Sequence, residues 1–233
     1  MNILAIDCAC DVLSVALAAG NGTFYTEIDA GVRHSELLME CADTLCKTAG
    51  ISPGDLNLAT CMKGPGSFTG LRIGYAAAKG IAVALGIPLR AVPTMDCLAY
   101  RLSIWPGIAL PAIDAKRGCF FAALYRNAKE LAGCMDASPQ TIAEKGIESR
   151  FSEGESVLLT GPGAELLFPR LSAHISGVRV DPDCRRGRAR ELLEIARSRL
   201  SEETDDLNSG PVYLRKSDAE EKWTGKSLSK NMV

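Results

Sequence analysis

The first half of the chain changes from short apolar runs to a helical hydrophobic pattern. Short runs rich in apolar residues predict three strands, over residues 2–7, 13–18 and 23–29, with Gly20-Asn21-Gly22 as the turn between the last two. Apolar residues at a spacing of 3.6 then predict an amphipathic helix over 35–49, whose core-facing side chains are Leu38, Cys41, Ala42, Leu45 and Ala49. The pattern continues with a strand, a helix and a strand, over 58–62, 71–85 and 87–92. Three strands followed by a strand–helix–strand unit predict a mixed sheet with flanking helices.

The second half of the chain repeats this order of elements. Leu4-Ala5-Ile6-Asp7 recurs as Pro111-Ala112-Ile113-Asp114, and Gly64-Pro65-Gly66 recurs as Gly161-Pro162-Gly163. The predicted elements are strands over 108–113, 119–125 and 157–160, a polar segment over 127–156 and a helix over 188–200. The alternative to a duplication is that common turn types converge on Asp and Gly.

Three antiparallel strands followed by a β-α-β unit form the ribonuclease H-like unit, and two such units in tandem form the actin, hsp70 and sugar kinase architecture. We therefore predict an α/β protein of two tandem duplicated ribonuclease H-like lobes, each a mixed sheet with flanking helices. The N-terminal lobe is expected over 1–105, with 188–216 packing back on it, and a smaller C-terminal lobe over 106–187. The polar residues 217–233 are expected to form a flexible tail.

Composition and charge argue against several classes of function and location. Lys and Arg number 26 against 28 Asp and Glu, so no global basic field is present to hold nucleic acid by itself. No apolar stretch approaches the roughly 20 residues of a membrane span, and the N-terminus lacks the pattern of a signal peptide. The nine cysteines contain no C-x-x-C pair, which predicts reduced thiols and a cytoplasmic location.

Few residue patterns could support catalysis. The two histidines, His34 and His174, are far apart in the sequence and form no H-x-x-x-H or H-E-x-x-H metal pattern. No G-x-S-x-G nucleophile elbow occurs, and Ser67 is expected to cap the following helix. We therefore predict no catalytic residue and no metal site in this chain.

A glycine-rich turn precedes the helix over 71–85. Its motif residues are Gly64, Gly66, Ser67, Thr69 and Gly70. The spacing matches neither G-x-x-x-x-G-K-[ST] nor G-x-G-x-x-G, so a tight, closely packed strand-to-helix turn is favoured over phosphate binding.

Asp7 and Asp114 each end the first strand of a half, where kinases and hsp70-like ATPases of this architecture bind metal and phosphate. Those enzymes place a glycine and a hydroxyl residue next, whereas here Cys8-Ala9-Cys10 follows Asp7. The two acids are thus either a vestigial phosphate site or structural acids that close their turns by accepting backbone N–H groups.

The helix over 71–85 is apolar almost all round, and the small residues Ala76, Gly80 and Ala84 would let another helix approach closely. Its second face needs cover from a neighbouring domain or from a separate chain, and we favour a protein interface. The predicted partner-binding residues are Met39, Cys46, Arg72, Ala76, Lys79, Gly80, Val83 and Ala84.

A basic run, Arg185-Arg186-Gly187-Arg188-Ala189-Arg190, opens the last predicted helix. Acidic residues at 191 and 194 balance it, so we expect a solvated amphipathic face, with local RNA contact as the alternative.

Several of these motifs, taken in order, resemble the bacterial TsaB family of tRNA threonylcarbamoyladenosine biosynthesis proteins over residues 3–216. They are Ile3-Leu4-Ala5-Ile6-Asp7, His34-Ser35-Glu36, the stretch 64–74, Ile113-Asp114-Ala115, Gly161-Pro162-Gly163-Ala164 and Pro211-Val212-Tyr213-Leu214-Arg215. The resemblance implies a degenerate hsp70- and actin-like fold that pairs with the catalytic paralogue TsaD. With the ATPase TsaE, that pair makes N6-threonylcarbamoyladenosine at position 37 of tRNAs reading codons that begin with A.

The resemblance further implies a non-catalytic subunit that activates its paralogue by forming a heterodimer through the helices over 35–49 and 71–85. It implies a homodimer when alone, tRNA contact through the complex, no firmly bound cofactor, and ATP and a metal ion in the partner subunits. This sequence departs from the family pattern in the turn after Asp7, where the family usually has Thr-Ser and this chain has Cys8-Ala9-Cys10. The alternatives are an ATP-dependent small-molecule kinase of the same fold and a peptidase, for which the sequence offers no nucleophile.

Overall fold

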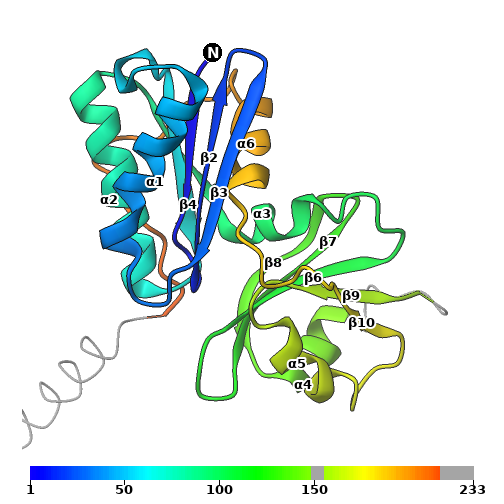
Figure 1. Ribbon diagram of the computed structural model, residues 1–233. Helices are drawn as coiled ribbons and strands as arrows, with labels where there is room; N and C mark the ends of the chain where they lie inside the picture. Colours follow the sequence, from blue (N-terminus) through cyan, green and yellow to red (C-terminus); the bar gives the residue numbers. More distant parts are fainter. Residues whose placement is uncertain (148–154, 216–233) are drawn as a thin grey trace, which may run out of the picture.

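The computed structural model describes residues 1–147 and 155–215, which form two lobes, each built on one five-stranded sheet (Figure 1). The N-terminal sheet has the order β3-β2-β1-β4-β5. Its strands are β1 (Ile3–Asp7), β2 (Val12–Ala19), β3 (Gly22–Asp29), β4 (Leu58–Gly64) and β5 (Leu89–Pro93). The β1–β2 and β2–β3 pairs are antiparallel, and the β1–β4 and β4–β5 pairs are parallel.

Helices cover both faces of the N-terminal sheet. One face packs against α1 (His34–Ala49) and α2 (Phe68–Leu85), and the other against α6 (Ala189–Ser198), which lies beside α3 (Thr94–Tyr100) (Figure 1). Strand β1 contributes side chains to the cores on both faces of the sheet, because successive side chains of a strand point to opposite faces. Its even-numbered side chains, at 4 and 6, join the core under α1 and α2, and those at 3 and 5 join the core under α6.

The C-terminal sheet repeats this topology, with the order β8-β7-β6-β9-β10. Its strands are β6 (Ile108–Asp114), β7 (Phe120–Arg126), β8 (Lys129–Ala137), β9 (Val157–Thr160) and β10 (Val178–Val180). Strand β6 takes the central place of β1, with an antiparallel neighbour on one side and a parallel neighbour on the other. The predicted duplication of a mixed ribonuclease H-like unit is therefore confirmed.

Short helices flank the C-terminal sheet. They are α4 (Pro139–Thr141), the π-helical turn η2 (Ile142–Ile147) and α5 (Ala164–Leu171); the N-terminal lobe has one further short element, the 3-10 turn η1 (Pro53–Asp55). Residues of η2 and α5 close the core on one face of the sheet, whereas residues of α3 pack on the other. Helix α3 thus lies between the two sheets.

The predicted elements differ from the observed ones in several places. The segment predicted as polar over 127–156 contains β8, whose half-exposed side chains weaken the alternation. Helix α3 and strand β10 were not predicted, because short elements leave little periodic signal. Helix α2 begins at Phe68 rather than at 71, directly after its capping residue.

Helix α6 packs on β1 and β2 of the first sheet although it follows the second sheet in sequence. The lobe boundaries at 105 and 187 remain our assignment, and the predicted tail over 217–233 lies outside the described residues. In the described part of the chain, no helix combines the length and apolarity needed to span a membrane. All nine cysteines are free thiols, as predicted.

Candidate docking surface and interlobe cleft

The glycine-rich turn between β4 and α2 packs against the backbone of the turn that follows β1. A Cβ at Gly66 would lie 2.5 Å from the backbone oxygen of Ala9, and a Cβ at Gly70 would overlap that of Cys8. The backbone N–H of Ser67 donates to the Ala9 oxygen at 2.7 Å. The space that glycine leaves is therefore filled by the protein's own main chain, which supports the close-packed turn favoured from the sequence over a phosphate loop.

Ser67 is the N-cap of α2. Its hydroxyl oxygen accepts the backbone N–H of Gly70 at 3.2 Å and so satisfies one of the free donors of the first turn, as predicted. Thr69, another residue of the motif, is exposed on the first turn of the helix. Within residues 1–147 and 155–215, the hydroxyl of Ser67 is hydrogen-bonded to the backbone of its own helix and to no acidic or basic side chain.

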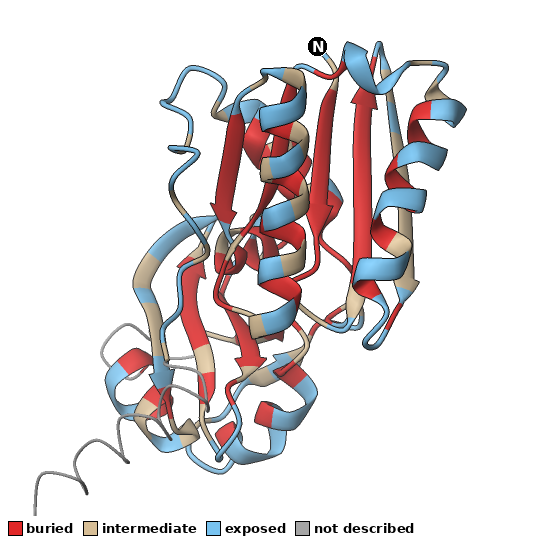
Figure 2. Cartoon of the chain, turned by 90° about the vertical axis from the view of Figure 1, so that its left-hand side faces the viewer, coloured by how far each residue is buried: buried red, intermediate tan, exposed pale blue. Residues whose placement is uncertain are grey.

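One face of α2 stays exposed along the whole helix. Arg72, Ala76, Gly80 and Ala84 are exposed, and 60% of the surface of Val83 is accessible. A Cβ at Gly80 would meet no atom within 4 Å, so the backbone itself is open to an approaching chain. Figure 2 views this side of the molecule, where exposed and buried positions alternate along α1 and α2. This exposed stripe on α2, with Met39 on α1, is the candidate docking surface.

The other predicted partner residues lie in different surroundings. Met39 is 53% exposed on α1 and borders the surface, and Lys79 is half-buried at its margin. Cys46 is 3% exposed and belongs to the hydrophobic core between α1 and the sheet. The prediction of Cys46 as a contact residue is therefore wrong, because the helix turns this position into the core that α1 forms with the sheet rather than towards solvent.

Part of the segment 188–216, which we expected to pack back on the N-terminal lobe, also borders the docking surface. Residues 200–215, here the C-terminal strap, run back along the first lobe after α6. The carboxylate of Asp205 accepts the Lys63 ammonium at 2.9 Å and the backbone N–H of Ala91 at 2.8 Å. Further along, the N–H of Val212 donates to the backbone oxygen of Lys63 at 2.7 Å. The strap thus lies across β4 and β5.

The strap then crosses the start of α2 and ends on the other lobe. The ring of Tyr213 lies 4.7 Å from that of Phe68, and the Arg72 guanidinium sits 3.9 Å above the Phe68 ring. Arg215 binds both carboxylate oxygens of Asp136 on β8, at 2.7 and 2.9 Å. The motif Pro211–Arg215 was visible in the sequence, but its contacts are too distant along the chain to be inferred from it.

Asp7 and Asp114 occupy equivalent positions and close equivalent turns. Asp7 Oδ1 accepts the N–H of Ala9 at 3.0 Å, and Asp114 Oδ1 accepts that of Lys116 at 2.8 Å. Their environments differ. Burial raises the pKa of Asp7 despite hydrogen bonds from Ala9 and Arg188. Burial acts in the same direction on Asp114, but hydrogen bonds from the side chain and backbone of Lys116 outweigh it and lower that pKa.

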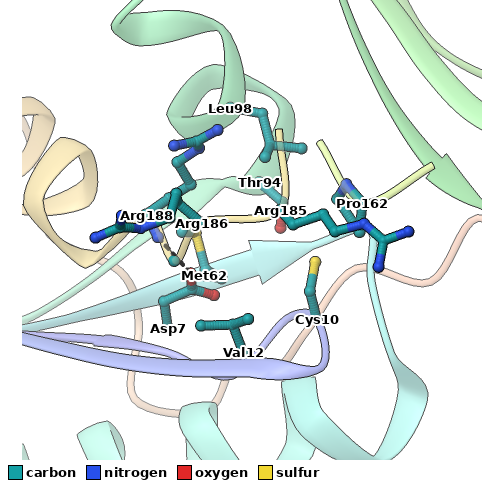
Figure 3. A pocket seen from close by; sticks show the side chains of 11 residues that line it. Asp7, Cys10, Val12, Met62, Thr94, Leu98, Pro162, Arg185, Arg186 and Arg188 are labelled. Atoms are coloured by element: carbon teal, nitrogen blue, oxygen red, sulfur yellow. Dashed lines mark hydrogen bonds between the residues drawn. The ribbon is translucent and has the colours of Figure 1, made fainter. Parts of the chain in front are cut away.

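The cleft between the lobes opens beside Asp7 and is lined on its other side by the basic run (Figure 3). The cavity measures only about 10 Å³, which is the space of one water molecule. Arg185 and Arg186 are exposed and form ion pairs with Glu165 and Glu27, whereas Arg188 is 2% exposed. The expectation of a solvated basic face is therefore wrong for Arg188, which is buried between the lobes.

No group of three or more His, Cys, Asp or Glu side chains converges as a metal site would require, within residues 1–147 and 155–215. The cysteine that lines the cleft, Cys10, is half-buried, and desolvation next to Asp7 raises the pKa of its thiol well above the ordinary value. It is therefore a protonated, weakly nucleophilic thiol.

Comparison with known proteins gives consistent results. A family model described as TsaD, tRNA N6-adenosine threonylcarbamoyltransferase, matches residues 28–223. The chain is 29% identical over 226 residues to the tRNA threonylcarbamoyladenosine biosynthesis protein TsaB of Bacillus subtilis, covering 96% of this chain and 98% of that protein. It is likewise 29% identical over 231 residues to TsaB of Escherichia coli, covering 97% and 100%.

A solved structure supports the fold alone. It is a protein of Pseudomonas aeruginosa described as uncharacterized with similarity to the peptidase YeaZ, which superposes with a TM-score of 0.78 at 22% identity. The match covers 92% of this chain and 99% of that chain, so both lobes are shared.

Proposed function

Because the chain belongs to the TsaD family of tRNA N6-adenosine threonylcarbamoyltransferases, and matches TsaB proteins along almost its whole length, we propose that it is a non-catalytic partner subunit in the synthesis of N6-threonylcarbamoyladenosine at position 37 of tRNA. It activates a TsaD-like catalytic paralogue by forming a heterodimer with it. The kinase and peptidase alternatives are not favoured by the relatives.

The exposed stripe on α2 is the observation that carries this proposal. Small residues at 76, 80 and 84 and the apolar Val83 form a surface that a second helix can approach closely, and no part of the described chain covers it. Burying such a surface supplies the hydrophobic stabilisation of a stable heterodimer, with a total buried area above about 1,200 Å². Docking then fixes the paralogue in its active geometry.

Several features of the complex belong to the same proposal. A TsaE-like ATPase joins the pair, ATP and a metal ion are bound by the partner subunits, and tRNA is contacted through the complex. The chain alone holds no cofactor firmly and pairs with itself through the same helices. The cytoplasm is the proposed location, which the free cysteines support.

The test is the substitution Gly80→Arg, with Ala76→Arg as a second variant. A Cβ at Gly80 meets no neighbour, and arginine is a better helix former than glycine, so the fold tolerates the change. A long cation at the helix contact is expected to weaken pairing with the cognate TsaD-like protein at least about 100-fold. Size-exclusion chromatography with light scattering measures pairing, and a tRNA threonylcarbamoylation assay measures activity in the reconstituted mixture.

Ser198→Arg is the matched control, because Ser198 is exposed at the end of α6, on the opposite face of the sheet. It is expected to pair and to activate like the unmodified chain. Normal pairing of both the Gly80 and the Ala76 variants would contradict the proposal that α2 is the docking helix. Threonylcarbamoylation by the isolated chain would instead contradict the proposal that this subunit is non-catalytic.

A further inference from the structure

Arg188 spans the space between the two lobes. It is the N-cap of α6 and is 2% exposed, an extreme burial for an arginine. Its backbone N–H donates to Asp7 Oδ2 in the first lobe at 2.9 Å. Its Nη2 donates to the backbone oxygen of Asp183 at 2.8 Å and to Thr160 Oγ1, at the end of β9, at 3.4 Å. One residue therefore hydrogen-bonds to the central strand of one sheet and to a strand of the other.

Carboxylates from both sides compensate the charge of the buried guanidinium. Asp181 Oδ2 lies 3.7 Å from Arg188 Nη2, and Glu191 Oε1 lies 4.0 Å from Nη1. A second arginine, Arg101 after α3, donates to Asp183 at 2.9 Å and to Asp181 at 3.4 Å. Each of the two guanidinium groups therefore has two carboxylate partners within 4.0 Å, which offsets the cost of burying its charge.

Two polar atoms in this region are buried without a hydrogen-bond partner. They are Arg188 Nε and Thr94 Oγ1, and both residues line the cavity between the lobes. Buried donors and acceptors are almost always satisfied, because leaving one unpaired costs free energy. The cavity of about 10 Å³ has room for one water molecule and for nothing larger.

We propose that Arg188 and one trapped water molecule form a fixed joint that holds the two lobes in a single orientation without a nucleotide between them. The water accepts the Nε–H of Arg188 and exchanges a hydrogen bond with the hydroxyl of Thr94. The joint does not depend on the proposed function, since it concerns contacts within this chain.

The first test uses the unmodified protein. A crystal structure at atomic resolution is expected to place one ordered water within hydrogen-bonding distance of Arg188 Nε and Thr94 Oγ1. Residual dipolar couplings in solution are expected to fit both lobes with one alignment tensor. A dry cavity, or lobes that need separate tensors, would overturn the joint.

The second test replaces the guanidinium with an apolar chain of similar length, Arg188→Met. Amide hydrogen exchange at Asp183, Arg188 and Ala189 is expected to accelerate at least about tenfold, and the two lobes are expected to lose their common tensor. Arg197→Met is the control, because Arg197 makes a surface ion pair on the same helix. It is expected to leave both readouts unchanged.

A milder variant keeps the test decisive if Arg188→Met does not fold. Thr94→Val removes one hydroxyl from the cavity while retaining its volume, and it is expected to expel the water and to accelerate exchange at Arg188 and Ala189 by about threefold. Unchanged exchange and a retained water in Thr94→Val, or a single rigid orientation in Arg188→Met, contradict the proposal.

Discussion

The two lobes share a strand order but differ in the helix that follows their Gly-Pro-Gly turns. In the first lobe α2 has 18 residues and exposes a continuous stripe of small and apolar positions. In the second lobe α5 has 8 residues, one of which is Pro169. Its exposed apolar side chains, Leu166 and Phe168, are isolated on this short helix. The same scaffold therefore has a long helix with an exposed stripe in only one of its two copies.

The close contact between turn and strand is common to both lobes, in contrast to the helices. Gly66 and Gly163 both approach the chain near the end of the central strand so closely that a Cβ has no room. The glycine pattern is therefore explained by packing in both copies. The lobes differ instead in the exposed surface of the helix that follows the turn, α2 or α5, and in the surroundings of Asp7 and Asp114.

The largest expected effect comes from filling the close contact in the first lobe. Gly70→Ala places a Cβ on the backbone oxygen of Cys8, and we expect a loss of about 3 kcal/mol or more in the free energy of unfolding. Denaturant unfolding followed by circular dichroism measures it. Gly80→Ala, on the same helix but in open space, is the control and is expected to gain up to about 1 kcal/mol. Equal midpoints for the two variants would contradict the packing argument.

A smaller effect is expected where the strap joins the lobes. Arg215→Ala removes a two-pronged ion pair with Asp136 whose side chains are 25% and 22% exposed, and we expect a loss of about 1 kcal/mol. The loss should shrink at high salt, since the pair is partly open to solvent. Arg185→Ala breaks a far more exposed pair with Glu165, and it should cost only a few tenths of a kcal/mol. If both substitutions cost the same, the strap does not hold the second lobe.

The smallest expected effect is on the pH dependence of stability. The contributions of Asp7 and Asp114 to stability are expected to change in opposite directions as the pH rises. The pKa of Asp7 is raised in the fold above its ordinary 3.8, so its native carboxyl keeps a proton that the unfolded chain has lost. Its contribution to stability is thus present below pH 3.8 and declines as the pH rises through the folded pKa. The pKa of Asp114 is lowered, so its contribution is present above pH 3.8 and declines as the pH falls.

Asn substitutions separate the two contributions. The stability advantage of the unmodified chain over Asp114→Asn is expected to shrink as the pH is lowered through and below 3.8. For Asp7→Asn, the advantage is expected to shrink as the pH is raised above 3.8. Unfolding curves measured across this range test both. Parallel pH profiles for the two variants would show that the acids do not differ as their surroundings indicate.

Much of the fold followed from local patterns in the sequence. The short apolar runs in 2–7 and 13–18, and the 3.6-residue spacing in 35–49, predicted strands and a helix that the structure contains. These patterns are local because each element must present one or two apolar faces to a core. The elements that were missed, such as α3 and β10, are too short to carry a period.

The candidate site was only partly predictable. Met39 and Cys46 lie on one helix and are both apolar, yet Met39 is exposed and Cys46 is in the core. The sequence showed that α2 is apolar on more than one side, but not which residues the rest of the chain would cover. That depends on the direction in which each helix faces its sheet.

By itself, the sequence determined the duplicated order of elements, the capped and close-packed turn before α2, and the small residues of its exposed face. The tertiary structure alone decided the burial of Arg188 and the individual contacts of the strap. Arg188 belongs to a run of arginines that looks solvated, and it is buried because Asp7, Asp181 and Thr160, all remote in sequence, supply the partners for its polar groups. Local periodicity reports which residues need a core or a solvent face, whereas pairing between distant polar groups exists only once the two lobes meet.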